Sequence, residues 1–366
     1  MTPQIPSELL PADGRFGSGP ARIRDAAIDS LAGPGRHVLG TSHRQAPVRG
    51  LVGRVQEGLA SLYDLPEGYE VVLGNGGSTL FWDAAICSLV EQRSAHGVFG
   101  EFSAKFAAAS RRAPHLADPA VVEVPAGQVA LPEATAEADV WAWAHNETST
   151  GALAPIERIG DGLVVVDGTS AAGGVALDPS LVDVYYFAPQ KCLGSDGGLW
   201  LALMSPAAIE RIARLDSTER WIPESLSLQV AVENSRKQQT LNTPAIATLW
   251  LLAEQLDWML AEGGLDFAAR RSARSAAALY GWAEAKDVTT PFVAEPYRSP
   301  VVGTIDFSDE VDAASIAAML RANGIVDTEP YRKLGRNQLR VGMYPSVEPS
   351  DVEALCDSID WLLENS

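Results

Sequence analysis

One lysine and one aspartate follow apolar, strand-forming runs, where their side chains could meet and do chemistry. Lys191 comes directly after the run at residues 184–188, and Asp167 ends the valine run at residues 164–166. If both runs are neighbouring buried strands, the two side chains lie at the same edge of a sheet. A lysine amine can form a Schiff base with the aldehyde of pyridoxal phosphate (PLP), and a carboxylate can keep the pyridine nitrogen protonated. The pair predicts Lys191 and Asp167 as catalytic residues, with a solvated turn lysine as the alternative.

The elements that must position these residues alternate between strand and helix. Strands are predicted at residues 70–73, 97–99, 121–124, 140–145, 163–167, 184–188 and 199–204. Helices between them include residues 79–92 and 102–112. The apolar runs are continuous rather than alternating in polarity, which is typical of a sheet covered by helices on both faces. We therefore expect an α/β large domain with a mostly parallel seven-stranded sheet.

The sequence pattern changes after residue 244. Two long helices are predicted at residues 244–262 and 265–285, with Gly263-Gly264 as the stop between them. The rest of the chain predicts strands at residues 301–307 and 339–343 and helices at residues 311–323 and 347–364. We expect a smaller C-terminal α/β domain, and divide the chain into an N-terminal arm (1–14), a large domain (15–255) and a small domain (256–366).

The composition is that of a globular protein with a strong negative charge. Of the 366 residues, 46% are hydrophobic and 20% are charged, and the formal net charge is −19. Because an acidic surface repels phosphate groups, binding to nucleic acid or to an anionic membrane is not expected. The three cysteines are far apart and no secretion signal is visible, so we expect reduced thiols and a cytoplasmic location. The five histidines show no metal-ligand spacing, and no metal site is predicted.

A glycine-rich turn follows the first predicted strand. Gly74-Asn75-Gly76-Gly77 leads into Ser78 and Thr79 at the start of a helix. Glycines let a ligand approach the backbone, and free N–H groups at a helix start bind phosphate. The turn lacks the Gly-Lys-Ser/Thr of a P-loop and the third glycine of a dinucleotide fingerprint. It fits a cradle for one phosphate at Gly77 and Ser78, with a plain N-capped turn as the alternative.

Two other strand ends carry side chains that suit a planar ligand. Phe102 opens the helix after the second strand, where it could stack on a ring or simply be a core residue. Thr148 lies in the polar run at residues 145–151 and could bind a ligand or orient Asp167, although such runs also form ordinary turns. Both positions follow strands of the predicted sheet.

Basic residues concentrate in two segments of this acidic chain. Residues 332–340 contain four cations and no acid, and His43-Arg44 forms a smaller group. Arginine can bind carboxylate or phosphate through two parallel hydrogen bonds, so the local change of sign suggests an anionic ligand. A solvated hairpin face is the alternative for residues 332–340 as a whole. Arg340 is the strongest candidate, because it opens an apolar strand where a charge without a partner is costly.

Together these stretches resemble the phosphoserine aminotransferase family, PLP enzymes of aminotransferase class V. The matches span nearly the whole chain in the family's order. They are Phe16-Gly17-Ser18-Gly19-Pro20-Ala21, Thr41-Ser42-His43-Arg44, the glycine turn to Ser78, Asn146-Glu147-Thr148, Asp167-Gly168-Thr169-Ser170, Ala188-Pro189-Gln190-Lys191, Asn242-Thr243-Pro244 and Arg340 with its strand. The resemblance implies the type I fold of PLP-dependent transferases.

The resemblance also implies a role for each candidate residue. Lys191 would bond to the cofactor and Asp167 would pair with its pyridine nitrogen. Phe102 stands where the family usually stacks a tryptophan on the ring, and Thr148 would contact the side of the ring. The other cofactor contacts would come from Gly77, Ser78 and Gln190 and, across a subunit interface, from Asn242 and Thr243. The substrate binders would be His43, Arg44 and Arg340, whereas no role is implied for Arg332, Lys333 and Arg336.

The activity implied by the resemblance is reversible amino-group transfer in serine biosynthesis. Glutamate and 3-phosphohydroxypyruvate would give 2-oxoglutarate and O-phosphoserine, and the same family site also serves a phosphorylated hydroxythreonine precursor of pyridoxine. The expected partners are these small molecules and a second copy of the chain, in a homodimer with shared active sites.

Two other functions compete with this interpretation. A desulfurase, another class V activity, would need a cysteine on a mobile loop, whereas Cys192 adjoins Lys191 in a fixed turn and Cys87 and Cys356 lie in predicted helices. A nucleotide-binding module would use the glycine turn and leave Lys191 and Asp167 unexplained. Visible absorbance of a bound cofactor would separate a PLP enzyme from a nucleotide-binding protein.

Overall fold

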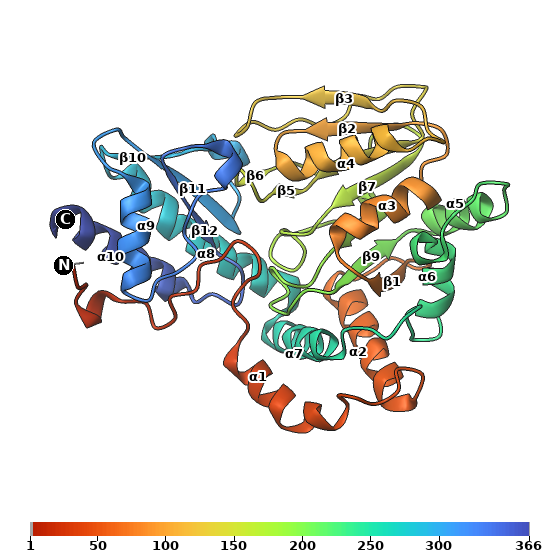
Figure 1. Ribbon diagram of the computed structural model, residues 1–366, viewed down its shortest axis with the longest axis horizontal. Coiled ribbons are helices and arrows are strands. Elements are labelled where there is room, and N and C mark those ends of the chain that lie inside the picture. The colour runs from red at the N-terminus through yellow and green to blue at the C-terminus, as the bar shows by residue number, and fades with distance from the viewer. Residues whose placement is uncertain (1–2, 366) are drawn as a thin grey trace.

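The strands of the large lobe form one sheet in the computed structural model, which describes residues 3–365 (Figure 1). In order across the sheet they are β1 (Glu70–Asn75), β9 (Leu199–Met204), β8 (Val184–Phe187), β7 (Leu163–Asp167), β4 (Val140–Ala144), β2 (Ser94–Val98) and β3 (Ala120–Glu123). The pairs from β8 to β3 are parallel, and among the described strands of this sheet β9 alone runs in the opposite direction. The predicted mostly parallel seven-stranded sheet is confirmed.

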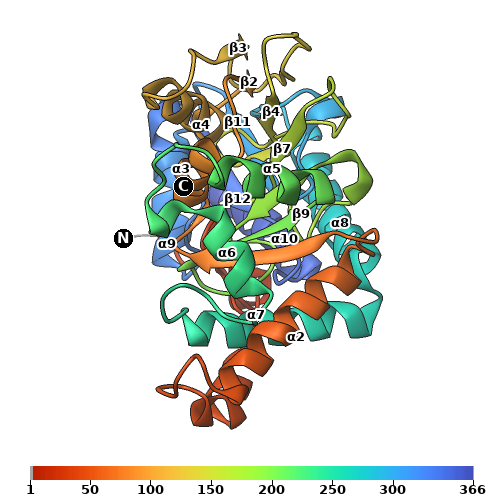
Figure 2. The same cartoon turned by 90° about the vertical axis from the view of Figure 1, so that its right-hand side faces the viewer.

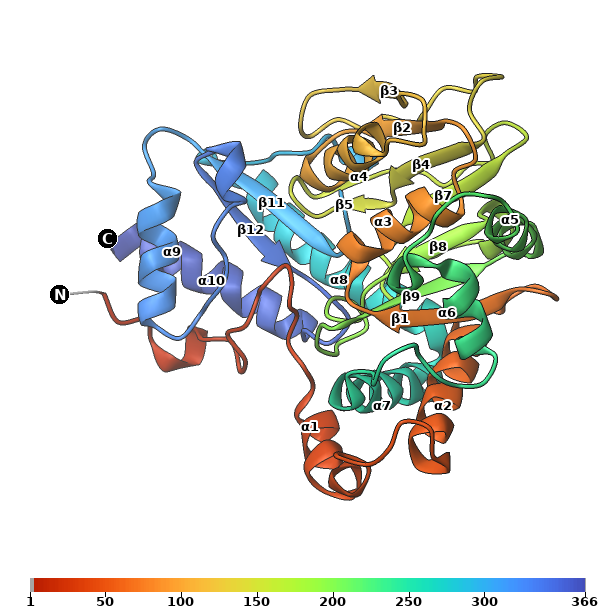
Figure 3. The same ribbon diagram turned by 45° about the vertical axis from the view of Figure 1, so that its right-hand side comes forward.

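Helices cover both faces of this sheet (Figure 3). One face packs against α2 (Ala46–Leu62) and α7 (Ile246–Glu262), which also contact each other (Figure 2). The other face packs against α3 (Ser78–Ser88), α4 (Glu101–Arg112), α5 (Pro206–Asp216) and α6 (Leu228–Ser235). Every residue of β4, β7, β8 and β9 is buried, which explains why their sequences are continuous apolar runs.

The small lobe is built on its own core. Its antiparallel sheet contains β10 (Thr289–Pro291), β11 (Val302–Phe307) and β12 (Gln338–Gly342), and its helices are α8 (Gly264–Glu284), α9 (Ala313–Ala322) and α10 (Pro349–Asn365). Ile5 and Phe16 from the first part of the chain belong to this core, which also contains residues of α10 (Figure 1). Sequence analysis predicted β11, β12 and the helices but not the short β10.

The expected boundary between the large and small domains falls inside a helix. Residue 255, the expected end of the large domain, lies within α7, and α7 and α8 are separated by Gly263. Gly263 and Gly264 have φ angles of 120° and 70°, a left-handed conformation that other residues seldom adopt, so the predicted Gly-Gly stop is confirmed. Residues 1 and 2 of the predicted arm and residue 366 lie outside the described residues, and the three-part division stays a prediction.

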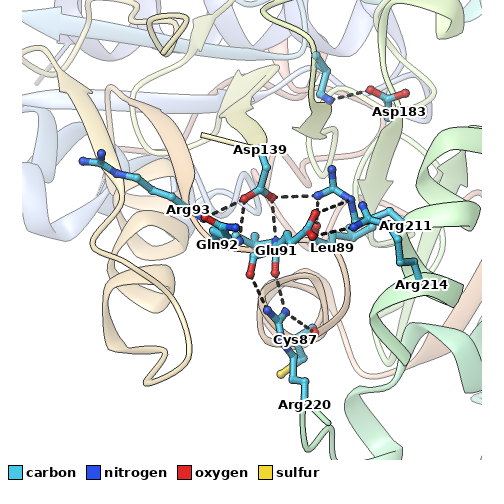
Figure 4. A network of polar contacts seen from close by, with 12 residues as sticks. Cys87, Leu89, Glu91, Gln92, Arg93, Asp139, Asp183, Arg211, Arg214 and Arg220 are labelled. Atoms are coloured by element: carbon cyan, nitrogen blue, oxygen red, sulfur yellow. Dashed lines mark hydrogen bonds and ion pairs between the residues drawn. The ribbon is translucent and has the colours of Figure 1, made fainter. Parts of the chain in front are cut away.

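A polar network ends α3 and ties it to the start of β4 (Figure 4). Asp139 accepts hydrogen bonds from the backbone N–H groups of Glu91, Gln92 and Arg93 at 2.8–2.9 Å. Arg220 donates to the carbonyl oxygens of Cys87 in the last turn of α3 and of Val90 and Glu91 after it. The network turns the chain sharply after α3. The helix therefore ends at Ser88 rather than at the expected residue 92.

Three shorter elements complete the α-helices and strands of residues 3–365. Helix α1 (Asp25–Ala32) contacts α7, and β5 (Asn146–Glu147) pairs with β6 (Ala152–Leu153) directly after β4. Within residues 3–365, no helix combines the length and the apolar character needed to cross a membrane.

Candidate active site

A cavity of about 460 Å³ opens at the carboxyl edge of the sheet, between the two lobes. Strand β7 ends at Asp167, and Lys191 and Thr148 follow the ends of β8 and β4. Eight of the predicted site residues line this cavity: Gly77, Ser78, Phe102, Thr148, Asp167, Gln190, Lys191 and Arg340. The fold therefore gathers residues that are far apart in the sequence.

Lys191 is a buried amine with 7% of its surface exposed. Its Nζ donates a hydrogen bond to Oγ1 of Thr148 at 2.7 Å. Burial lowers the pKa of Lys191 to about 8, against the opposing effect of the Asp167 carboxylate, and the nearby Arg340 charge lowers the pKa further. The amine therefore loses its proton more readily than an ordinary lysine, and the neutral form can act as a nucleophile or as a base.

The backbone passes very close to Lys191. A Cβ on Gly19, which has a φ of 140°, would lie 2.8 Å from Cε of the lysine. A side chain at this position would displace the amine, which explains the glycine in the matching Gly17-Ser18-Gly19-Pro20 stretch.

Asp167 is a buried carboxyl with 8% exposure. Its Oδ1 accepts a hydrogen bond from the backbone N–H of Thr169 at 2.8 Å. Burial raises the pKa of Asp167, whereas the Thr169 hydrogen bonds and the Lys191 charge favour the carboxylate. A cationic group in the cavity would further stabilise this carboxylate.

A chain of hydrogen bonds links the amine of Lys191 to the segments that follow β4 and β7. Thr148 accepts from the amine and donates to Oγ of Ser170 at 2.8 Å, and Ser170 donates to the carbonyl oxygen of Asn146 at 3.0 Å. The side-chain amide of Asn146 also donates to Ser170. Sequence analysis did not select Asn146, Thr169 or Ser170 as site residues, although they follow strand ends in the same way as Asp167 and Thr148.

The glycine turn has the features of an anion cradle. Helix α3 begins at Ser78, and within the described chain no side chain caps its first turn. No described atom comes within 4 Å of a Cβ built on Gly77, so a ligand has room beside this backbone. Oγ of Ser78 lies 2.6 Å from Oγ1 of Thr169, which joins the turn to the end of β7. Free N–H groups and the helix dipole favour a phosphate here.

Phe102 and Tyr331 form an aromatic wall of the cavity. Their ring centroids are 6.1 Å apart, and Nζ of Lys191 lies 5.3 Å from the centroid of Phe102. Tyr331 comes from the small lobe and Phe102 from α4 of the large lobe, so this wall joins the two lobes. Tyr331 was not predicted as a site residue, because no local pattern connects it with Phe102.

Arg340 brings a positive charge into the cavity. Its Nη1 donates to the carbonyl oxygen of Thr148 at 3.1 Å, and its guanidinium carbon lies 5.5 Å from the Tyr331 ring centroid. Its buried Nε has no partner within the described chain. Burial lowers the pKa of Arg340, but arginine stays protonated in proteins. A half-buried guanidinium without a described carboxylate partner fits the binding of an anionic ligand.

Four predicted site residues do not line this cavity: Arg44, Asn242 and Thr243 are exposed, and His43 is half-buried. Nδ1 of His43 lies 3.1 Å from Oγ1 of Thr243, whose carbonyl oxygen accepts from the side chain of Asn75. Arg44 donates to Gln239 at 2.9 Å. None of the four lines the cavity of its own chain. The interface roles of Asn242 and Thr243 and the substrate-binding roles of His43 and Arg44 stay predictions.

The other basic residues at positions 332–336 face the protein surface. Lys333 forms an ion pair with Glu101, and Arg336 forms one with Asp306. The Lys333 contact joins the small lobe to the start of α4 at the mouth of the cavity. Arg332 is exposed.

Comparisons with known proteins agree with this geometry. The family model described as aminotransferase class V matches residues 124–355. The chain belongs to the class V aminotransferase family. One relative in this family is a putative phosphoserine aminotransferase of Mycolicibacterium vanbaalenii, 60% identical over 99% of this chain and 98% of its own length. Another is a phosphoserine aminotransferase of a Nocardioides species, 58% identical with the same coverage.

Solved structures of the class V aminotransferases show the same fold. A phosphoserine aminotransferase from Cytophaga hutchinsonii matches with a TM-score of 0.87 at 23% identity, covering 95% of this chain and 99% of that chain. One from Bacillus circulans subsp. alkalophilus has a TM-score of 0.85 at 19% identity, covering 96% and 98%. The predicted fold of the PLP-dependent transferases is confirmed.

Proposed function

We propose that this protein is a PLP-dependent phosphoserine aminotransferase. It would transfer an amino group reversibly between glutamate and 3-phosphohydroxypyruvate, yielding 2-oxoglutarate and O-phosphoserine. The observation that carries the proposal is the meeting of Lys191, Asp167 and Arg340 in one cavity of a class V aminotransferase. Relatives at 58–60% identity along the whole chain carry the name of this activity.

The residues of the cavity fit PLP. The open space at Gly77 and the start of α3 suit a phosphate group. The side chain of Gln190 is also free to form hydrogen bonds with a ligand, because its buried Oε1 has no partner within residues 3–365. Phe102 offers an aromatic face, and Asp167 offers a buried carboxyl. Bound here, PLP would supply an aldehyde that carries the amino group and a ring that accepts the electron pair of the substrate α-carbon.

The chain's own residues would bind, orient and move protons. Nζ of Lys191 would hold the cofactor covalently and, once released, take the proton from the substrate α-carbon as a base. Asp167 would hold a proton on the ring nitrogen through its charge. Thr148 would keep Nζ in position between these steps, since its hydroxyl already accepts a hydrogen bond from it.

The substrates would be bound by arginines of two subunits. Arg340 would bind a substrate carboxylate from within the cavity, while His43 and Arg44 of the partner would bind the phosphate or the second carboxylate. Asn242 and Thr243 would reach the cofactor phosphate of the partner site. The position of these four residues outside their own cavity, with Arg44, Asn242 and Thr243 exposed, supports a homodimer with shared sites.

A desulfurase is the weaker candidate. Cys192 is buried and its thiol donates to the carbonyl oxygen of Ser170, and burial raises its pKa. Burial raises the pKa of Cys356 in α10 to about 12. Neither thiol has the accessible thiolate that a sulfur acceptor needs.

We further propose that the protein works in the cytoplasm and can accept phosphohydroxythreonine or its keto acid.

A coupled assay on the purified holoenzyme tests the proposal. Production of 2-oxoglutarate from glutamate is measured with 3-phosphohydroxypyruvate as acceptor, and the unphosphorylated hydroxypyruvate is the matched control. Pyruvate and glyoxylate are included because structures of similar fold come from a pyridoxamine–pyruvate and an alanine–glyoxylate aminotransferase. We expect a clear preference for the phosphorylated acceptor. Equal or better turnover of pyruvate or glyoxylate would contradict the substrate assignment.

A further inference from the structure

Glu147 is a fully buried carboxylate beside the cavity, with 0% exposure. No lysine or arginine within residues 3–365 forms an ion pair with it. Its oxygens instead accept from the N–H groups of Phe102, Ser103 and Ser149 at 3.0–3.3 Å and from the hydroxyls of Ser103 and Ser149 at 3.0 and 2.7 Å. A buried charge is tolerated when it receives several hydrogen bonds in this way.

The contacts of Glu147 complete the first turn of α4. Gly100 precedes this helix, and within the described chain it has no side-chain cap of its own. The N–H of Glu101 donates to Oγ of Ser149, while those of Phe102 and Ser103 donate to Glu147. The carboxylate also lies at the positive end of the helix dipole. A Cβ on Gly100 would lie 2.3 Å from Cγ of Glu147, so the helix start is fitted closely around this side chain.

The neighbouring residue gives Glu147 a link to the catalytic group. Thr148 accepts a hydrogen bond from Lys191 at its hydroxyl and from Arg340 at its carbonyl oxygen. Glu147 thus contacts the start of α4, which carries Phe102, while Thr148 contacts the amine of Lys191 and the guanidinium of Arg340. A shift of Glu147 would move Phe102 relative to Lys191.

We propose that Glu147 is a positioning residue that fixes the ring of Phe102 against the cofactor by capping α4 from a distant segment. The inference rests on the proposed function, because it requires PLP to bind beside Phe102. Glu147 itself does not line the cavity. In this proposal its effect on the cofactor passes mainly through Phe102, and this distinguishes a positioning role from a general contribution to folding.

A double-mutant cycle tests this coupling. The dissociation constant of PLP is measured by titrating the apoprotein of wild type, Glu147→Gln, Phe102→Leu and the double variant, with the melting temperature recorded for each. Glutamine keeps the shape but places an amide N–H against the backbone donors. We expect each single variant to weaken PLP binding about three- to tenfold, the size of one aromatic contact. In the Phe102→Leu background, Glu147→Gln should add less than about twofold.

Asp139→Asn is the matched control, because Asp139 also accepts three backbone N–H groups but at the far end of β4. It should lower the melting temperature and leave the PLP constant unchanged. If Glu147→Gln fails to fold, Ser149→Ala removes the 2.7 Å hydrogen bond and enters the same cycle. Additive effects of Glu147 and Phe102 would overturn the positioning role. Failure of wild type to bind PLP would overturn the proposed function instead.

Discussion

Lys191 and Arg340 are held by the same residue. Oγ1 of Thr148 accepts from the lysine at 2.7 Å, and the carbonyl oxygen of Thr148 accepts from the arginine at 3.1 Å. The two cations of the cavity therefore keep a fixed mutual position, and the arginine charge contributes to the lowered pKa of the amine. The short segment after β4 thus fixes the positions of both the reacting amine and the substrate-binding guanidinium.

Replacing Lys191 with alanine should abolish covalent attachment of PLP and reduce transamination by more than about 1000-fold, because Lys191 is the amine that lines the cavity. The attachment is measured by mass spectrometry after borohydride reduction. Lys286→Ala is the control, since Lys286 pairs with Asp360 in the small lobe. A reduced PLP adduct on the Lys191→Ala protein would show that another amine serves the cofactor.

Asp167→Asn should keep the fold and bind PLP, but lower kcat on the order of 1000-fold, since an amide cannot hold a proton on the ring nitrogen. The amide oxygen can still accept from the N–H of Thr169, which preserves the turn. Asp196→Asn is the matched control, because Asp196 also lines the cavity but is exposed. Turnover near that of wild type would assign the electrostatic role to a different group.

Arg44→Ala and Arg340→Ala should each raise KM for glutamate and for the phosphorylated keto acid, with a loss of roughly 2–5 kcal/mol in substrate binding. If the sites are shared, a mixed dimer of the two variants contains one site with both substitutions and one with neither. Co-expression with two affinity tags isolates this dimer. We expect one site with the wild-type KM to reappear; activity no higher than that of the parent variants would mean that Arg44 serves its own chain or has no role in binding.

The buried amine should make the stability of the apoprotein depend on pH. The pKa of Lys191 falls from its ordinary value of 10.5 to about 8 on folding, so between these values the unfolded chain binds more protons and stability rises with pH. Relative to a Lys191→Met variant, wild type should gain on the order of 1.5 kcal/mol in unfolding free energy between about pH 8 and 9.5. Urea unfolding of both apoproteins at the two pH values measures this difference. If the difference in unfolding free energy between the two proteins is the same at both pH values, the pKa of Lys191 in the folded protein lies near its ordinary value.

The sequence by itself determined the sheet and the residues at its strand ends. The runs before Asp167 and Lys191 are apolar throughout because both faces of β7 and β8 are covered, and this pattern is readable in four or five consecutive residues. Gly263 and Gly264 marked the break between α7 and α8 because their left-handed φ angles are a local property of glycine.

The tertiary structure alone decided which distant side chains meet. Glu147 caps a helix that begins more than forty positions earlier, and Tyr331 packs against Phe102 from the other lobe. It also placed Arg44 outside the cavity that Arg340 of the same chain lines. Such contacts depend on how whole elements pack, and a short stretch of sequence carries no signal for them. The strand ends were predictable because a strand buried on both faces leaves an apolar run of a few consecutive residues, whereas the partners of polar side chains are set by long-range packing.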